Sequence, residues 1–247
     1  MAPCSPSSAR ANRSSSPPAW PWALWPWPAA SSWPCGGPPR TARRAVSPAK
    51  PFPCLHRALR GALALEEALA ARRSVRDYAP GPLTLAEVGQ LLWAAQGVTS
   101  PEGFRTAPSA GALYPLELYL VVGEVEGLAP GVYHYEPESH ALTRIIAGDL
   151  RRVLEMAALG QDYVRTAAVD LVLTGVYQRT ARRYGERAQR YVHMEAGHAG
   201  QNVYLQAEAL GLGTVAIGAF NDEEVQRLLS LPAEEAPLYI MPVGRKP

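Results

Sequence analysis

The distribution of proline divides this chain into two parts that fold under different constraints. Residues 1–54 hold 13 of the 24 prolines, five of the six tryptophans and all three cysteines. Proline fixes φ and lacks a backbone N–H, so the repeated prolines of residues 16–34 exclude a regular helix or a central strand. We therefore expect residues 1–61 to be an irregular, disordered N-terminal segment and residues 62–247 to form the folded domain.

The charge distribution limits the classes of molecule that the folded domain is expected to bind. Residues 1–54 carry six Arg or Lys and no acid, so the remainder holds 18 basic and 22 acidic side chains, a net charge of −4. An acidic domain is not expected to bind nucleic acid. No apolar stretch is long enough to cross a bilayer, which favours a cytoplasmic protein without a membrane span. Arg10 and Arg13 precede an apolar stretch, so a secretory signal and export are the alternative, and a misplaced start codon is a third reading.

Neither the cysteines nor the histidines form a metal-binding pattern. The cysteines, which have no CxxC pair and no neighbouring histidines, are Cys4, Cys35 and Cys54. In HMEAGH, residues 193–198, the two histidines lie about 140° apart around a helix, not on one face. We expect no metal, and we expect Glu195 and His198, three residues apart, to satisfy each other or to lie in a subunit interface.

Apolar periodicity predicts a domain of mixed helices and strands. Capping boxes at Thr84–Glu87 and Asn221–Glu224 mark two helix starts. Further helices are predicted from residue 62, at 149–159 and at 186–210, with strands at 116–122, 132–135, 168–176, 214–217 and 237–243. The order is not a strict βαβ alternation, so the predicted class is α+β, with helices packed on a mixed sheet.

The motif ARRSVRDY, residues 71–78, concentrates positive charge. Guanidinium forks and a hydroxyl are suited to gripping a phosphate. These groups belong to Arg72, Arg73, Ser74 and Arg76. The arginines could equally cover the carbonyls at a helix C-terminus. More positive charge follows the last predicted strand, in GRK at residues 244–246, although that segment could be a solvated tail.

Two glycine-containing segments could approach a flat ligand. In PSAGALYP, residues 108–115, Ser109, Ala110 and Gly111 are small enough for close backbone approach, although the segment could also be a simple turn. No GxSxG elbow surrounds Ser109, so we do not expect a hydrolytic nucleophile. GLGTVAIG, residues 211–218, follows a helix and lacks dinucleotide spacing, which excludes a Rossmann site.

From about residue 64 to the end, the chain resembles the nitroreductase-like flavoenzymes, and among them the SagB-type dehydrogenases related to azoline oxidases. The resemblance rests on five ordered strings. They are ALEEALAARRSVRDY, QLLWAAQGVTSPEG, RTAPSAGALYPLELYLV, RYVHMEAGHAGQNVYLQAEALGLGTVAIGAF and MPVGR. It implies a nitroreductase-like fold with a mainly antiparallel central sheet and a homodimer that holds FMN non-covalently at the subunit interface.

The resemblance also implies roles for individual residues. Arg72, Ser74 and Arg245, the last preceded by Gly244 in the matching string, would hold the phosphate, with Arg73 beside them and Arg76 near the pyrimidine edge of the ring. Pro108, Ser109 and Ala110 would pack on the flavin from the other subunit. Gly218, flanked by Ile217 and Ala219, would offer a backbone donor to the ring nitrogen that takes the hydride.

One departure from the family pattern leaves the reaction open. Azoline oxidases place a Lys-Tyr pair where this chain has Arg190 and Tyr191, and arginine is a poor general base. We therefore expect an FMN-dependent oxidoreductase that works by ping-pong hydride transfer, with NAD(P)H as a possible donor. The alternatives are an azoline (thiazoline or oxazoline) peptide dehydrogenase that uses oxygen, and a non-catalytic flavin-binding scaffold.

Overall fold

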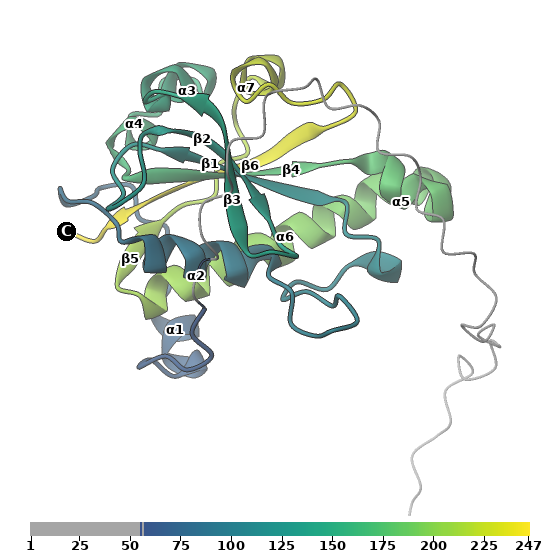
Figure 1. Ribbon diagram of the computed structural model, residues 1–247, viewed down its shortest axis with the longest axis horizontal. Helices are drawn as coiled ribbons and strands as arrows, with labels where there is room; N and C mark the ends of the chain where they lie inside the picture. The colour runs from purple at the N-terminus through teal and green to yellow at the C-terminus, as the bar shows by residue number, and fades with distance from the viewer. Residues whose placement is uncertain (1–54, 56) are drawn as a thin grey trace, which may run out of the picture. The chain divides into compact units, whose positions relative to one another are not determined.

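The computed structural model describes residue 55 and residues 57–247, which build one six-stranded sheet (Figure 1). The strand order is β3-β2-β1-β4-β6-β5. The strands are β1 Leu116–Val122, β2 Gly131–Glu136, β3 Ala141–Ala147, β4 Val169–Gly175, β5 Leu212–Thr214 and β6 Ala236–Arg245. All five strand pairings are antiparallel. The sheet is thus antiparallel throughout its named strands, in agreement with the mainly antiparallel sheet that the family resemblance implies. The predictions for the three cysteines and for the signal-like stretch fall outside the described residues.

Helices cover both faces of the sheet (Figure 1). They are α1 Leu65–Ala71, α2 Leu85–Gln96, α3 Arg151–Ala157, α4 Tyr163–Thr166, α5 Tyr177–Tyr184, α6 Ala188–Ala209 and α7 Asp222–Leu228. Along β1 the side chains alternate. Leu118 and Leu120 join the core under α2 and α6, while Tyr119 and Val121 join the core under α3 and α7. Period-two alternation therefore produces a helix–sheet–helix sandwich, confirming the α+β prediction.

Different local interactions determine the residues at the start and at the end of α2. At its start the predicted capping box is present, because the Thr84 N–H donates to Glu87 Oε2 (2.7 Å) and the Glu87 N–H donates to Thr84 Oγ1 (3.2 Å). At its end Gly97 has φ −65°, so left-handed backbone is not the reason for glycine there. A Cβ on Gly97 would lie 2.0 Å from Trp93 Cδ1, so the glycine makes room for the indole.

Three elements were not predicted: the four-residue helix α4, which is too short to show a period, and two elements with weak apolar patterns. β3 is an edge strand with mostly half-exposed side chains, and α5, YQRTARRY, is polar over most of its surface. The last residues of the segment expected to be irregular contact the folded part. The Leu55 N–H donates to His140 O (2.8 Å), and Ala58 exchanges hydrogen bonds with the Gln90 side chain (2.7 and 3.0 Å).

Candidate functional site

Residues 72–76, the arginine segment, run extended from the end of α1 along the edge of β5. The Val75 N–H donates to Thr214 O (2.9 Å). A Cβ on Gly213 would lie 2.6 Å from Val75 Cγ1, and one on Gly244 would lie 2.7 Å from Tyr78 Cγ. Two glycines of β5 and β6 therefore admit the side chains of Val75 and Tyr78. This packing explains a glycine at each position, and the predicted cofactor role of Gly244 stays a prediction.

The three arginines of this segment have different tasks. The Arg73 guanidinium donates to Ala70 O (3.0 Å) and Arg72 O (2.8 Å), so it caps α1, as the alternative reading of the motif allowed. The Arg72 guanidinium lies 5.1 Å from the centre of the Tyr204 ring, and Arg76 lies 5.9 Å from that of Tyr163. Arg72 and Arg76 remain available to an anion, because their described contacts are with aromatic faces.

Tyr204 of α6 joins the arginine segment to the loop after β5. Its hydroxyl is 3.1 Å from Ser74 Oγ and accepts the Ala216 N–H (2.8 Å). Sequence analysis did not single out this residue. In the sequence, the only indication of its role is that it is a tyrosine within the fourth of the five matching strings. Its two hydrogen-bonding partners, Ser74 and Ala216, are not adjacent to it in the sequence.

The 217–219 loop presents small residues beside this junction. Ile217 is buried and exchanges both backbone hydrogen bonds with Ile240 (2.8 and 3.1 Å), whereas Gly218 and Ala219 are exposed. A Cβ on Gly218 would meet only Tyr239, at 4.0 Å, so packing within the described chain does not require glycine there. The Gln161 side chain donates to Ala219 O (2.9 Å) and fixes the loop.

Arg245, at the end of β6, is directed elsewhere. Its guanidinium pairs with Glu87 (2.9 and 3.0 Å) and donates to Pro82 O (2.9 Å), and the Lys246 ammonium binds Glu208 (2.6 Å). Partial burial raises the pKa of Glu87, but hydrogen bonds from Arg245 and Thr84 outweigh it and lower that pKa. The described contacts therefore do not bring the Arg245 side chain to Arg72 or Ser74, and its phosphate role stays a prediction.

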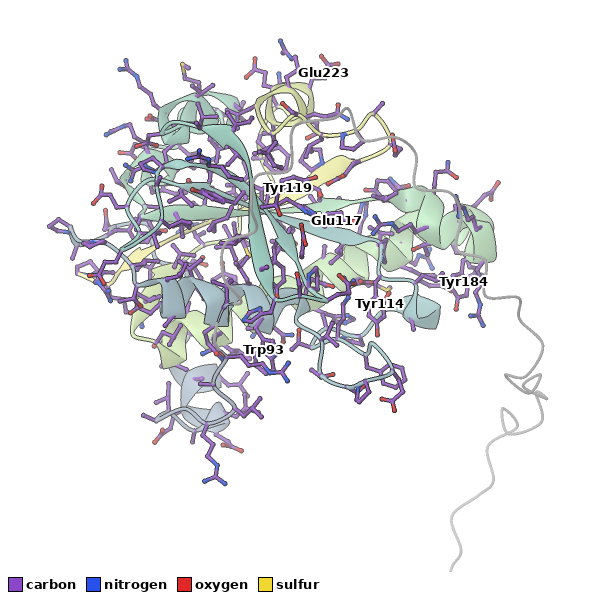
Figure 2. The ribbon with its side chains drawn as sticks, viewed as in Figure 1. Trp93, Tyr114, Glu117, Tyr119, Tyr184 and Glu223 are labelled. Atoms are coloured by element: carbon purple, nitrogen blue, oxygen red, sulfur yellow. The ribbon has the colours of Figure 1, made fainter. Side chains whose placement is uncertain are left out.

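The second predicted segment is a loop, residues 105–115, that is fixed around Tyr114 (Figure 2). The Tyr114 N–H donates to Ser109 Oγ (2.9 Å), and its carbonyl accepts from Arg179 (3.1 Å). Its ring lies under the Arg105 guanidinium at 4.7 Å. Tyr114 has φ +46° and Gly111 has φ +64°, so the backbone is left-handed at a residue where that conformation is uncommon. Pro108 is exposed, and Ser109 and Ala110 are half-buried.

A buried ion-pair network anchors the 105–115 loop to the sheet. Glu117 on β1 pairs with Arg179, the residue that holds the Tyr114 carbonyl, and with His134 Nε2 (2.8 Å). Burial raises the pKa of Glu117, but hydrogen bonding from His134 and the Arg179 charge outweigh it and lower the pKa to about 2. Figure 2 shows Glu117, Tyr114 and Tyr184 at the same end of the sheet.

Glu195 of α6 lies beneath this loop and corrects one expectation. It is only 3% exposed, whereas His198 is exposed, so the two do not satisfy each other. Burial raises the pKa of Glu195 to about 7, against the lowering effects of a hydrogen bond with Ser109 and of the Arg105 charge. The buried carboxyl of Glu195 therefore interacts with the 105–115 loop, through Ser109 and Arg105.

Tyr191 also lies close to this loop, through its neighbour Tyr184. The two rings meet edge-to-face with centroids 5.0 Å apart. A Cβ on Gly111 would lie 2.8 Å from the Tyr184 hydroxyl, so Tyr184 packs directly on the loop. Arg190, the preceding residue, is exposed.

The predicted site residues thus form two separate groups within one chain. No described hydrogen bond or ion pair joins the arginine segment to the 105–115 loop. The α6 residues next to Ser74 and Ser109, which are Tyr204 and Glu195, lie nine residues apart, about 13 Å along the axis. The start of the loop comes nearer to Tyr204, because Asn202 Nδ2 donates to Thr106 O (3.4 Å). Among the described residues no cluster of His, Cys, Asp or Glu could hold a metal, and no helix has the length and hydropathy to cross a membrane.

Comparison with known proteins identifies the family. The model of the nitroreductase family matches residues 69–245. MJ1384 of Methanocaldococcus jannaschii, whose name places it among the nitroreductases, is 52% identical over 182 residues, 74% of this chain and 91% of that protein. The NADPH-flavin oxidoreductase of Vibrio harveyi is 32% identical over 112 residues, 42% of this chain and 47% of that protein.

A solved structure shares the fold at moderate identity. A chain of the Escherichia coli microcin synthetase McbBCD complex with truncated pro-MccB17 is 26% identical, covers 73% of each chain and has a TM-score of 0.61. This likeness and the family match confirm the predicted fold. The chain belongs to the nitroreductase family, whose members include flavin oxidoreductases.

Proposed function

We propose that this protein is an FMN-dependent oxidoreductase that works by ping-pong hydride transfer. The observation that carries the proposal is the grouping of Arg72 and Ser74 with the loop of the exposed Gly218, connected through Tyr204. Arg76 approaches the same loop over Tyr163, which is hydrogen-bonded to Gln161 and through it to Ala219. Cations for a phosphate and an open glycine for a flat ring meet there. FMN, when bound, supplies the chemistry of accepting a hydride from a donor and passing it to an acceptor.

The residues present fit this cofactor. Arg72 and the Ser74 hydroxyl would bind the phosphate, and Arg76 would place positive charge near the pyrimidine edge, where it stabilises negative charge developing on the ring. The Gly218 backbone would face the ring, since among the described residues only Tyr239, at 4.0 Å, comes near the space that its missing Cβ leaves. Arg73 supports this arrangement by ending α1, and Arg245 by neutralising Glu87.

A homodimer would complete the site. Because the 105–115 loop lies apart from the arginine segment in one chain, we propose that Pro108, Ser109 and Ala110 cover the flavin held by the partner subunit. Two copies related by a twofold axis would then share two equivalent sites.

Arg190 and Tyr191 would act differently in the two candidate reactions. In a reductase of nitroaromatic or quinone compounds, Tyr191 would donate a proton and Arg190 would act as a fixed cation. The alternative, dehydrogenation of a thiazoline or oxazoline peptide with oxygen as the oxidant, is supported by the likeness to the microcin synthetase complex. A flavin-binding scaffold without turnover is the remaining, non-enzymatic candidate.

The flavin itself provides the decisive test. Purified protein should be yellow and release FMN on heating, and anaerobic NADH or NADPH should bleach it. Arg72→Ala should reduce bound flavin at least about tenfold, as expected for loss of a charge-assisted phosphate contact. Arg73→Ala, the matched control, should retain flavin because that guanidinium caps α1.

The outcomes separate the candidates. A colourless protein that takes up no added FMN would contradict every flavin function. Bleaching by an azoline peptide and not by NAD(P)H would favour the peptide dehydrogenase, and flavin inert to every donor would favour the scaffold.

A further inference from the structure

Four arginines gather where α5 meets α6, and none of them has an acidic partner among the described residues. They are Arg182, Arg183, Arg187 and Arg190. All four are exposed, and their described contacts include no carboxylate, while Arg151, Arg165 and Arg179 are each held in an ion pair. The arginine segment, which we assign to the cofactor phosphate, is another group without described acidic partners, and separate arginines without one, such as Arg57, Arg152 and Arg227, occur elsewhere among the described residues.

The spacing of this second group disfavours a purely structural role. Arg187 is the N-cap of α6 and Arg190 lies three residues on, so two like charges lie on neighbouring turns and repel each other. The stretch from residue 179 to residue 190 contains five arginines and one acid, Glu186. A solvated helix face selected for stability would alternate the signs of its charges.

Two of these arginines, Arg187 and Arg190, border a hollow. An open depression of about 830 Å³ is lined by Glu186, Arg187, Gln189, Arg190, His193 and Met194. His193 is fixed on one side by a hydrogen bond to the Tyr177 hydroxyl (2.7 Å), and Met194 is 53% exposed and adds an apolar wall. Two guanidinium forks, an amide and an apolar surface suit a small organic anion, and the two arginines outweigh the one carboxylate of the lining, that of Glu186.

The hollow adjoins the part of the chain that we place over the flavin ring. A Cβ on Gly111 would lie 3.1 Å from Arg183 Nη1, and Tyr184 packs between the 105–115 loop and Tyr191. Arg190 is the direct neighbour of Tyr191 in α6, and Arg187 precedes Tyr191 by one turn. A group bound by these arginines would therefore belong to a molecule close to the reacting centre.

We propose that Arg187 and Arg190 bind a carboxylate or phosphate of the small-molecule substrate, so that this enzyme selects anionic substrates. The inference rests on the proposed flavin function and specifies its substrate class. It gives Arg190 an anion-binding role where the related oxidases have a lysine.

Matched substrate pairs test the proposal. For the acceptor, kcat/KM is compared between 4-nitrobenzoate and its neutral analogue 4-nitrobenzamide with NADH as donor. For the donor, NADPH is compared with NADH, with 4-nitrobenzamide as acceptor. The charged member of at least one pair should be favoured about tenfold, the effect of one charge-assisted hydrogen bond. The favoured pair identifies whether a carboxylate on the acceptor or a phosphate on the donor occupies the hollow.

Substitutions test whether the preference for the charged substrate arises at Arg187 and Arg190. The double substitution Arg187→Gln/Arg190→Gln should abolish the preference, which is read as the ratio of kcat/KM between the charged and the neutral member of each pair and therefore does not depend on a change in rate common to both. Arg152→Gln, an exposed arginine on α3 across the sheet, is the matched control and should retain the preference. Raising the salt from about 0.01 to 0.15 M should weaken it, because the screening length falls from about 30 to 8 Å.

Equal kcat/KM within both pairs, or a preference that survives the double substitution, would overturn the proposal. If the protein binds no flavin, the proposed function fails first, and calorimetric titration with 4-nitrobenzoate and 4-nitrobenzamide still tests the hollow. Saturable binding of the carboxylate alone, lost in the double variant, supports it; no binding, or equal binding of both compounds, contradicts it.

Discussion

Glu195 shows how one side chain can link the interior of the domain to a surface loop. Its carboxyl is buried in α6, its hydrogen-bonding partner Ser109 belongs to the 105–115 loop, and the nearest cation that affects it is Arg105. Since burial raises its pKa to about 7, the folded protein binds a proton there that the unfolded chain has already lost near pH 5 to 6.

The sign of this shift gives a stability prediction. Between the unfolded pKa, near 4.5, and about 7 the folded state holds the extra proton, so wild-type stability should fall as the pH rises through this window. Glu195→Gln, which stays neutral, should be more stable than wild type at pH 8, by on the order of 1 to 3 kcal/mol, and not at pH 4. Urea unfolding at the two pH values measures the difference.

His198→Gln is the control, because His198 is exposed on the same helix. If the difference in unfolding free energy between Glu195→Gln and wild type is the same at both pH values, Glu195 does not titrate in this window.

Among the larger elements, the docking of the arginine segment on β5 and β6 depends on two missing side chains. Val75 and Tyr78 occupy the space that Gly213 and Gly244 leave open. A methyl at Gly213 would approach Val75 Cγ1 to 2.6 Å, and Val75 is branched at Cβ and cannot easily turn away.

Gly213→Ala should therefore destabilise the domain by about 1 to 3 kcal/mol, the usual cost of overpacking. Adding Val75→Ala should recover part of that loss, and a denaturant double-mutant cycle measures the recovery. Gly218→Ala should change stability little, since its Cβ would meet only open space and Tyr239. Additive effects of the first two substitutions would contradict direct contact between these positions.

Local signals in the sequence predicted most elements of this fold, while long-range contacts were not accessible. The capping box at Thr84 is present because it needs only residues three apart. At Asn221 the side chain accepts from the Glu224 N–H (3.1 Å) as predicted, but the Asn221 N–H donates to Ala157 O (2.8 Å) and not to Glu224. The roles of Tyr204 and Tyr114 depend on partners that only the folded chain brings near, such as Ser74 for the first and Arg179 for the second. The residue types in the motifs indicated a phosphate and a flat ligand. The different contacts of Arg72, Arg73 and Arg76 could be identified only from the structure.

At the scale of the whole molecule, two separated half-sites make a prediction about mixed dimers. A chain carrying Arg72→Ala loses the phosphate side, and a chain carrying Ala110→Asp loses the ring side. If each flavin lies between subunits, neither homodimer retains FMN, but a heterodimer has one intact site and one doubly damaged site. Refolding an equal mixture should then restore about a quarter of wild-type flavin, as random pairing makes half of the dimers mixed.

Flavin absorbance after gel filtration measures this recovery. Mixtures of either variant with itself provide the controls. No recovery in the mixture, with both variants folded and dimeric, would place each flavin within a single chain.

The strand order has a consequence for how the protein is made. β6, the last strand to be synthesised in this sequence, pairs with β4 on one side and β5 on the other, so β5 has no sheet partner until residues 236–245 emerge. A nascent chain that stalls before that point exposes the edge of β4 and the apolar face of α6, surfaces that favour association with other chains. Ribosome pausing late in the message, more than early in it, should therefore determine how much of this protein needs a chaperone.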